Sequence, residues 1–387
     1  RFFSTGATEV MLKAYHAWGL DFPKRLHGMF AFAIHERESG RVVLGRDRFG
    51  IKPLYLAETA NGLRFASSLP ALVAAGGIDT ALDREALAFY MTWHAVVPAP
   101  WTILEGVRKL PPATVRVVAP DGRREDHEYW RLSFERTPED IETPREVWRE
   151  RVMAALETAV DRRMVADVPV GVLLSGGVDS SLIVALLAKK GQADLKTFSI
   201  GFEAAKGEHG DEFRYSDLVA ETFATEHHQI FVPSADLVHE LPKTIAAMSE
   251  PMVSYDNVGF FLLSREVAKH VKVVQSGQGA DEVFGGYHWY PPMAECIDPV
   301  SDYARVFCDR GHQEYLRAVH PRMHGDDHSR AFIRDHFERP GAAAGVDKAL
   351  RIDQLIMLVD DPVKRVDNMT MAAGLEARVP FLDHELV

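Results

Sequence analysis

The fold of this chain is decided by the stretch Val168-Pro169-Val170-Gly171-Val172-Leu173-Leu174-Ser175-Gly176-Gly177-Val178-Asp179-Ser180-Ser181-Leu182-Ile183. Its apolar half, which ends before Ser175, is typical of a strand covered on both faces. Its last residues begin an apolar pattern with helical spacing, which Leu186 and Leu187 continue. The turn between them therefore lies at a helix N-terminus, where unpaired backbone N–H groups and glycines without a Cβ favour an anion. The stretch predicts a phosphate-binding loop.

The polar residues of this loop indicate its phosphate chemistry. Ser175, Ser180 and Ser181 carry hydroxyl donors, and Asp179 is placed to reach a metal ion that bridges phosphates. The Walker pattern is absent, because the loop has neither the closing Lys nor the four-residue gap between its glycines. A loop without this lysine suits pyrophosphate that leaves when a substrate attacks the α-phosphate of ATP. The alternative is a tight strand-to-helix connection, with Gly for packing and Ser or Asp as a cap.

A second stretch repeats this design. Residues 271–287 (Val-Lys-Val-Val-Gln-Ser-Gly-Gln-Gly-Ala-Asp-Glu-Val-Phe-Gly-Gly-Tyr) have the pattern of a strand, a glycine-rich turn and an acidic helix start. We expect this turn to open at the same sheet edge, where Asp281 would offer Mg²⁺ a second carboxylate. The alternative is that Asp281 and Glu282 only favour a helix start through its dipole, worth about 0.3–1 kcal/mol each.

Composition narrows the function classes. The chain has 387 residues, a formal net charge of −12 and no Lys/Arg stripe long enough for a nucleic-acid footprint, so a small-molecule substrate is favoured. Cys296 and Cys308 have no metal or redox spacing, which favours a reducing cytoplasm. No apolar run approaches the roughly 20 residues of a membrane span. Because the chain opens without Met and stops inside an apolar pattern, we expect a fragment of a longer protein.

Two halves of the chain have different patterns. Residues 27–130 alternate short strand-like runs with turns and, together with helical segments, favour an α+β half built on antiparallel sheet. From residue 145 onward helices and strands alternate, which favours a parallel doubly wound sheet with ligands beyond the carboxyl ends of its strands. The charged segment between the halves contains two prolines and has no apolar periodicity, as is typical of a linker. The predicted organisation is a domain at 1–135, a linker at 136–144 and a domain at 145–387.

These motifs carry a family resemblance. Residues 175–180 resemble the pyrophosphate loop of the N-type ATP pyrophosphatases. Both loops, together with the segments 197–202, 225–228 and 375–383, resemble glutamine-dependent asparagine synthetases, and the segments 28–33 and 45–55 resemble the glutaminase half of those enzymes. The resemblance implies an α+β N-terminal-nucleophile glutaminase-like domain, truncated at its N-terminus. It implies that an α/β parallel-sheet ATP pyrophosphatase domain of the adenine nucleotide alpha hydrolase type follows, truncated at its C-terminus.

The resemblance also implies a reaction and a site. The glutaminase would release ammonia, and the synthetase half would activate a carboxylate as its acyl-adenylate, which ammonia then attacks. The implied ligands are ATP, Mg²⁺, glutamine or ammonia, and a small carboxylate. Neither nucleic acid nor a membrane is an expected partner, and the protein could form a homodimer. The implied ATP- and pyrophosphate-binding residues are Leu173, Ser175, Gly176, Gly177, Asp179, Ser180, Ile200, Ser276 and Gly277, and the implied metal ligands are Asp179 and Asp281.

Departures from the family pattern concern glutamine first. The family nucleophile is a Cys at the mature N-terminus, a part that neither Cys296 nor Cys308 can play. The family usually carries an Asp that binds the α-amino group of glutamine, and this chain has Ala7 at that position. The substitution removes a charge-assisted contact worth roughly 1.5–3 kcal/mol, so we expect weak use of glutamine even by an intact protein.

A second departure concerns the acceptor. Many asparagine synthetases carry Glu where this chain has Gln278, and an amide neither acts as a base nor carries charge, which argues against aspartate as the substrate. Residues 276–281, 287–291 and 94–100 resemble the N-acetylglutaminylglutamine amidotransferase branch, which amidates a dipeptide to make an osmolyte. Arg378 is a candidate contact for the substrate carboxylate, the alternative being a structural ion pair with Glu376 or Asp383.

Other functions stay open. Asparagine synthesis from aspartate is the nearest alternative, and a tRNA-modifying pyrophosphatase is a further one that the acidic charge disfavours. Ala7, Gln278 and the missing ends leave room for a non-catalytic ATP-binding relic. The pair His227-His228 has no third ligand at metal spacing, so we expect a helix-to-strand corner there.

Overall fold

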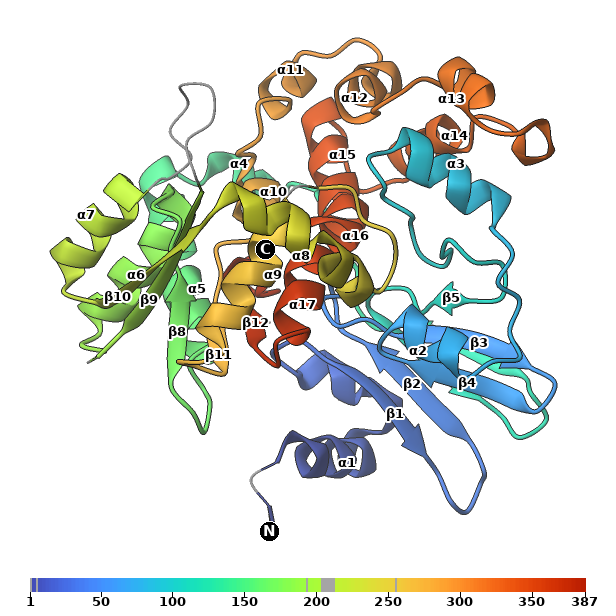
Figure 1. Cartoon of the computed structure of the whole chain (residues 1–387), viewed down its shortest axis with the longest axis horizontal. Helices are drawn as coiled ribbons and strands as arrows, with labels where there is room; N and C mark the ends of the chain where they lie inside the picture. Colours follow the sequence, from blue (N-terminus) through green and yellow to red (C-terminus); the bar gives the residue numbers. More distant parts are fainter. Residues whose placement is uncertain (1, 5, 193, 203–212, 255) are drawn as a thin grey trace. The chain divides into compact units, whose positions relative to one another are not determined.

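Two units make up the chain in the computed structural model, which describes residues 2–4, 6–192, 194–202, 213–254 and 256–387 (Figure 1). The first unit comprises Arg1–Leu87 and Val97–Ser133, and the second comprises Ala88–Val96 and Phe134–Val387. Helix α3 (Arg84–Thr92) begins in the first unit and ends in the second.

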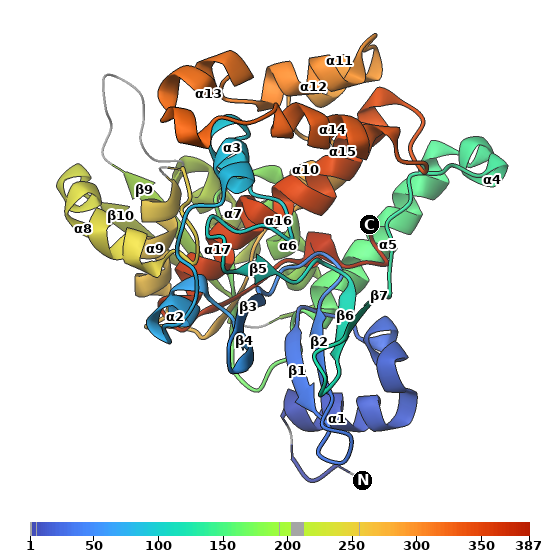
Figure 2. The same cartoon turned by 90° about the vertical axis from the view of Figure 1, so that its right-hand side faces the viewer.

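The first unit contains two antiparallel sheets. One has the order β1 (Ala31–His35), β2 (Val42–Arg46), β6 (Thr114–Val118), β7 (Arg124–Glu128). The other has the order β4 (Gly62–Ala66), β3 (Tyr55–Thr59), β5 (Arg108–Lys109). The unit also contains helix α1 (Ala7–Trp18), the 3₁₀ helix Gly19–Arg25 and helix α2 (Leu69–Ala74), and Figure 2 shows its sheets and helices from another side.

Alternation along the strands builds this unit in layers. On β2, Val43 belongs to the core that includes Ala14 of α1, whereas the next residue, Leu44, packs with Leu56 of β3. On β3, Tyr55 turns the other way, into the core that includes residues of α2. Because successive strand residues point to opposite faces, the layers are helix, sheet, sheet, helix. The predicted α+β class of this half is confirmed.

The second unit is built on a parallel sheet. Its order is β10 (Glu226–Val232), β9 (Lys196–Phe202), β8 (Val170–Leu173), β11 (Val273–Gln275), β12 (Glu376–Arg378). All four neighbouring pairs are parallel. The chain runs outward from β8 to β10 and then returns to β11 on the other side of β8. Such a reversal opens a crevice at the carboxyl ends of the two central strands. The predicted α/β class is confirmed.

Helices cover both faces of this sheet. Val172 and Leu174 pack against α5 (Arg145–Arg162) and α6 (Val178–Lys189). Leu173, which points the other way, packs with residues of α9 (Asp256–Val267) and α17 (Pro362–Met371). A strand buried on both faces accounts for the uninterrupted apolar run in the sequence.

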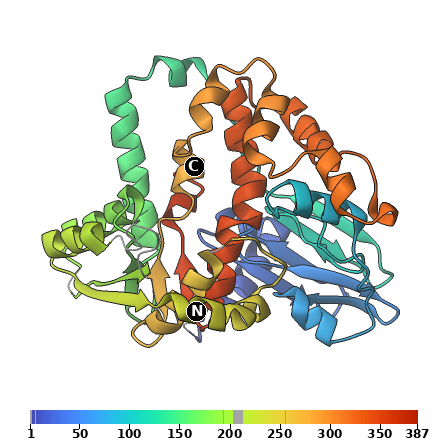
Figure 3. The same cartoon turned by 45° about the horizontal axis from the view of Figure 1, so that its top comes forward.

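A helical segment links β11 to β12, and most of its helices were not predicted. It contains α10 (Ala280–Phe284), α11 (Tyr290–Ala294), α12 (Pro299–Phe307), α13 (His312–Ala318), α14 (His328–Glu338) and α15 (Gly345–Ile352). From α15 the chain continues through a π-helical turn (Asp353–Met357) and α16 (Leu358–Asp360) into α17, the red helical column of Figure 3. The buried Asp353 carboxylate accepts hydrogen bonds from Trp289 Nε1 at 3.1 Å and from the hydroxyls of Tyr290 and Tyr303, which ties the column to α11 and α12.

Two local features differ from the sequence patterns. Strand β7 was not predicted, because its residues Arg-Glu-Asp-His-Glu are polar throughout. A short helix, α4 (Pro138–Glu142), lies within the predicted linker, where Thr137 and Asp140 form a reciprocal capping box. The box supplies hydrogen-bond acceptors to N–H groups at the helix start and so stabilises a helix that has no apolar periodicity in its sequence.

Candidate active site

The predicted phosphate loop connects β8 to α6. Gly176 has φ of 86°, in the left-handed region, and a Cβ there would lie 2.6 Å from Tyr215 Cβ and 2.7 Å from Ser216 N. Ser175 N–H donates to Ser180 Oγ at 3.2 Å, and Gly177 N–H donates to Ser175 Oγ at 3.2 Å. The backbone thus turns where only glycine fits, and serine hydroxyls hold the turn.

The second predicted loop connects β11 to α10 and contacts the first. Ser276 N–H donates to Arg378 O at 2.9 Å, which continues the sheet edge. A Cβ on Gly277 would lie 3.1 Å from Asp179 Cβ and 3.2 Å from Ser180 N. The missing side chain at Gly277 therefore lets the two loops meet.

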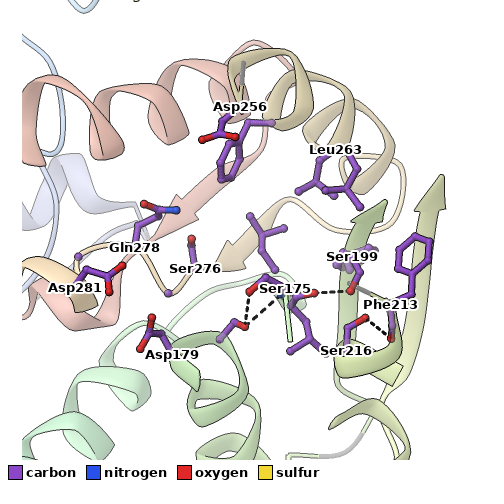
Figure 4. A pocket seen from close by; sticks show the side chains of 18 of the residues that line it. Ser175, Asp179, Ser199, Phe213, Ser216, Asp256, Leu263, Ser276, Gln278 and Asp281 are labelled. Atoms are coloured by element: carbon purple, nitrogen blue, oxygen red, sulfur yellow. Dashed lines mark hydrogen bonds between the residues drawn. The ribbon is translucent and has the colours of Figure 1, made fainter. Parts of the chain in front are cut away.

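Both loops border a pocket of about 560 Å³ at the carboxyl ends of β8, β9 and β11 (Figure 4). Its volume is in the usual range for small-molecule and cofactor sites. Gly176 and Gly177 shape the loop without lining the pocket. The predicted site residues that line it are Leu173, Ser175, Asp179, Ser180, Ile200, Ser276, Gly277, Gln278 and Asp281.

Two carboxylates lie together at one end of this pocket. Figure 4 shows Asp179 and Asp281 near Gln278, away from Ser199, Phe213 and Ser216. Burial raises the pKa of each carboxyl group, and the pKa of Asp179 is raised further by the charge of Asp281. The Asp281 carboxylate occupies space left by Gly286, since a Cβ there would lie 2.0 Å from Asp281 Oδ1. Paired oxygen donors that repel each other without a cation fit a hard divalent ion such as Mg²⁺.

Glu282 lines the same pocket, although its place in the sequence predicted no role beyond a helix start. Its side chain is buried, its Oε1 accepts the Tyr287 hydroxyl hydrogen at 2.8 Å, and its backbone carbonyl accepts Gln354 Nε2–H at 2.8 Å. Burial raises the pKa of this carboxyl group to about 7. The partner Gln354 is distant in the sequence, so no local pattern could have revealed the contact.

Other residues that line the pocket belong to helices and strands for which the sequence did not show which side chains face the pocket. Asp256 pairs with Arg365 at 3.6 Å, and Arg365 pairs with Asp361 at 3.4 Å, which connects α17 to the pocket wall. The lining residues that the sequence analysis did not assign are Leu174, Phe198, Ser199, Phe202, Phe213, Ser216, Asp256, Phe260, Leu263, Gly279 and Glu282.

Arg378 does not line the pocket. Its Nε donates to Glu376 at 2.6 Å, and its Nη1 donates to the carbonyls of Arg163 and Val165 at 2.9 and 2.8 Å. Asp383, the other partner considered for Arg378, pairs with Arg162 and Arg163 instead. The guanidinium of Arg378 therefore has the surroundings of a structural ion pair, and we assign it no substrate contact.

In the first unit, Ala7 begins α1 without any side-chain cap. The segment 45–55, which resembles a glutaminase, is held by a network of largely buried hydrogen bonds around Asp47 and Arg46. The buried Asp47 carboxylate accepts N–H groups of Phe30, Ile51 and Lys52 at 3.2, 2.9 and 2.9 Å. The neighbouring Arg46 donates to three backbone carbonyls, those of Lys52, Leu110 and Gly50.

Known protein families match both halves of the chain. The asparagine synthase family model matches residues 151–387, and the glutamine amidotransferase domain model matches residues 1–130. Asparagine synthetase [glutamine-hydrolyzing] 1 of Bacillus subtilis is 30% identical over 417 residues, covering 97% of this chain and 63% of the relative. A putative glutamine-hydrolyzing asparagine synthetase of Mycobacterium tuberculosis is 34% identical over 427 residues, covering 100% of this chain and 64% of the relative. The chain thus spans somewhat less than two thirds of their length.

Solved structures are more distant. The NH3-dependent NAD synthetase of Campylobacter jejuni aligns with 46% of this chain and 90% of its own, at 12% identity and a TM-score of 0.27, too low to support an argument. Across the described residues, the helices include none with the length and apolar character needed to cross a membrane.

Proposed function

Because the chain belongs to the asparagine synthase family and carries a glutamine amidotransferase domain ahead of the synthase domain, we propose that the protein is an ATP-dependent ligase that forms amides. In the proposed reaction, a substrate carboxylate oxygen attacks the α-phosphate of ATP and pyrophosphate leaves. Ammonia then attacks the acyl carbon of the adenylate, and AMP leaves with loss of a proton. The observation that carries this proposal is the pocket in which two glycine-rich loops bring serine hydroxyls and two carboxylates to one sheet edge.

The residues of the pocket suit the parts of ATP differently. Ser175, Ser180 and the first N–H groups of α6 would hold pyrophosphate, since they supply neutral donors at a helix N-terminus. Leu173 and Ile200 would receive the adenosine on the apolar side, as the family resemblance implies. Asp179 and Asp281 would hold Mg²⁺, which neutralises charge on the departing pyrophosphate.

We propose that an N-acylated dipeptide, N-acetylglutaminylglutamine, is the acceptor. The support is chemical: Gln278 faces the pocket with a neutral amide, which offers hydrogen bonds and no charge. Aspartate carries an α-ammonium group that favours an ionised partner, whereas an acylated dipeptide has no such group. Asparagine synthesis remains the second candidate, favoured by the names of the relatives.

Glutamine would be the ammonia source through the first unit. Because Ala7 offers no side-chain acceptor at the position of the family Asp, we propose that free ammonia supports the reaction better than glutamine does. We further propose that the glutaminase-like and synthetase domains divide at residues 136–144.

Product analysis tests the proposal. The full-length protein is incubated with ATP, Mg²⁺, ammonia and a panel of carboxylates that includes aspartate and acetylated Gln-Gln, and amidated products are identified by mass spectrometry. We expect amidated dipeptide with equimolar AMP and pyrophosphate. Release of ADP and phosphate would refute adenylation, and amidation of aspartate alone would refute the acceptor. Asp179→Asn serves as the matched control and should abolish product while leaving the fold intact.

A further inference from the structure

The pair His227-His228, which the proposed function leaves unused, lies on β10 next to the pocket. The two rings take opposite faces of the strand. His228 stacks on Phe198 at a centroid distance of 5.1 Å, whereas His227 contacts Thr197 and Ser199 of the neighbouring strand β9. Ser199 lines the pocket, so His227 lies one side chain behind the proposed ATP site.

Ser199 holds the residue at which the phosphate loop begins. Leu174 follows the last residue of β8, and its N–H donates to Phe198 O at 2.8 Å, while its carbonyl accepts the Ser199 hydroxyl hydrogen. In a continuing parallel ladder a backbone N–H would bind that carbonyl. The hydroxyl of Ser199 therefore replaces a ladder bond at the point where β8 leaves the sheet to form the loop.

The hydrogen-bond directions around His227 follow from this carbonyl. A carbonyl only accepts, so the single hydroxyl hydrogen of Ser199 is committed to Leu174, and Ser199 Oγ must accept from His227 Nε2 at 3.3 Å. The carboxylate of Asp217 lies 3.6 Å from the same nitrogen, too far for a hydrogen bond, and its negative charge favours a hydrogen there. The hydrogen bond to Ser199 Oγ therefore requires a hydrogen on Nε2.

The other ring nitrogen is then an acceptor. Burial lowers the pKa of His227, which favours a neutral ring with one hydrogen. Because that hydrogen is on Nε2, Nδ1 accepts the hydroxyl hydrogen of Thr197 at 2.8 Å, and Thr197 in turn accepts from Thr225 at 2.8 Å. All hydrogens then point the same way, from Thr225 toward Leu174.

We propose that His227 is a positioning residue of the ATP site: its Nε2–H fixes the Ser199 hydroxyl on the Leu174 carbonyl and so holds the start of the phosphate loop. The role rests on the proposed ATP-binding function of that loop. It predicts that a side chain with a donor in the place of Nε2 suffices, and that a group in the place of Nδ1 does not.

Two substitutions separate these positions. The amide of Gln reaches the place of Nε2, whereas the shorter Asn reaches only that of Nδ1. Dissociation constants for α,β-methylene-ATP with Mg²⁺ are measured by calorimetry on the full-length protein and on the variants His227→Gln, His227→Asn, Ser199→Ala and Ser199→Ala with His227→Asn. We expect His227→Gln to stay within about twofold of the unsubstituted protein, and His227→Asn to bind roughly two- to tenfold more weakly, the range of one neutral hydrogen bond. The double variant should bind no more weakly than Ser199→Ala, because both changes break one chain.

The outcomes are distinguishable. Equal losses for Gln and Asn, or additive losses in the double variant, would overturn the positioning role while ATP binding stands. An unsubstituted protein that does not bind the nucleotide would overturn the proposed function, and the role of His227 with it. Imidazole ¹⁵N shifts of the unsubstituted protein provide the second measurement: we expect the Nε2–H tautomer, and the Nδ1–H tautomer would refute the hydrogen-bond order regardless of ATP.

Discussion

Gly176 and Gly177 are adjacent in the phosphate loop, yet substituting each by Ala should have different consequences. At Gly176 the left-handed φ of 86° penalises any L side chain, and the added Cβ would lie 2.6 and 2.7 Å from atoms of Tyr215 and Ser216. Left-handed backbone costs about 1–2 kcal/mol and overpacking about 1–3 kcal/mol. At Gly177, φ is −67° and the nearest atom to a Cβ is the movable Ser175 Oγ at 3.3 Å.

We therefore expect Gly176→Ala to lower the free energy of unfolding of the second unit by about 2–5 kcal/mol, or to displace the loop from helix α7 (Phe213–Phe223), which contains Tyr215 and Ser216. Gly177→Ala, the matched control, should cost about 0.5–1 kcal/mol, because Ala is a poorer N-cap than Gly. Urea unfolding measures the loss, and the thermal shift produced by Mg·ATP reports the loop. Ligand at 100 times its dissociation constant stabilises by about 2.7 kcal/mol, a shift that Gly176→Ala should largely remove. Equal stability and equal ATP shifts in the two variants would refute this account of the turn.

Substitutions at three carboxylates give further predictions. Asp281→Asn should raise the melting temperature of the ligand-free protein at neutral pH, because it removes a charge that burial disfavours, and should abolish stabilisation by Mg²⁺ in calorimetry; a retained Mg²⁺ effect would exclude this ligand. Glu282 has its pKa raised from 4.5 to about 7, so the folded protein binds more protons than the unfolded one between these values and stability falls as pH rises through them. Glu282→Gln should flatten that part of the melting profile, and an unchanged slope would contradict it. Asp47→Ala should leave three N–H groups without their acceptor, two of them buried and one partly buried, and cost about 3 kcal/mol or more, whereas Asp47→Asn keeps an acceptor and should cost less. Hydrogen exchange at Ile51 and Lys52 measures both effects, and equal protection in the two variants would refute this role of Asp47.

The central strand β8 was predictable because it is apolar and buried on both faces. The expected strand, which runs from Val168 and ends before Ser175, contains β8. Strand β7 could not be found in this way. Its polar residues are held by ladder bonds to β6 and by cross-strand pairs such as Arg116 with Asp126 at 2.6 Å, contacts that depend on where β6 lies.

The residues of the candidate site likewise fall into those that a local sequence pattern reveals and those that depend on remote contacts. Residues of the two loops were predictable since the glycines and acids that form them are contiguous in sequence. Asp256 and Glu282 were not, because their places in the pocket depend on partners as remote as Arg365 and Gln354. Arg378 shows the converse: the sequence left a substrate contact and an ion pair with Glu376 or Asp383 both open, and only the structure shows its guanidinium bound to Glu376 and two backbone carbonyls.

The π-helical turn at Asp353–Met357 has a consequence for how this gene can change. A helix advances about 100° per residue, so the loss of a single codon here would convert the turn into ordinary α-helix and rotate everything beyond it by that angle. Arg365 on α17 would then swing away from Asp256, although no residue of the pocket had been altered. Selection should accordingly tolerate exchange of side chains in this turn more readily than a change in its length.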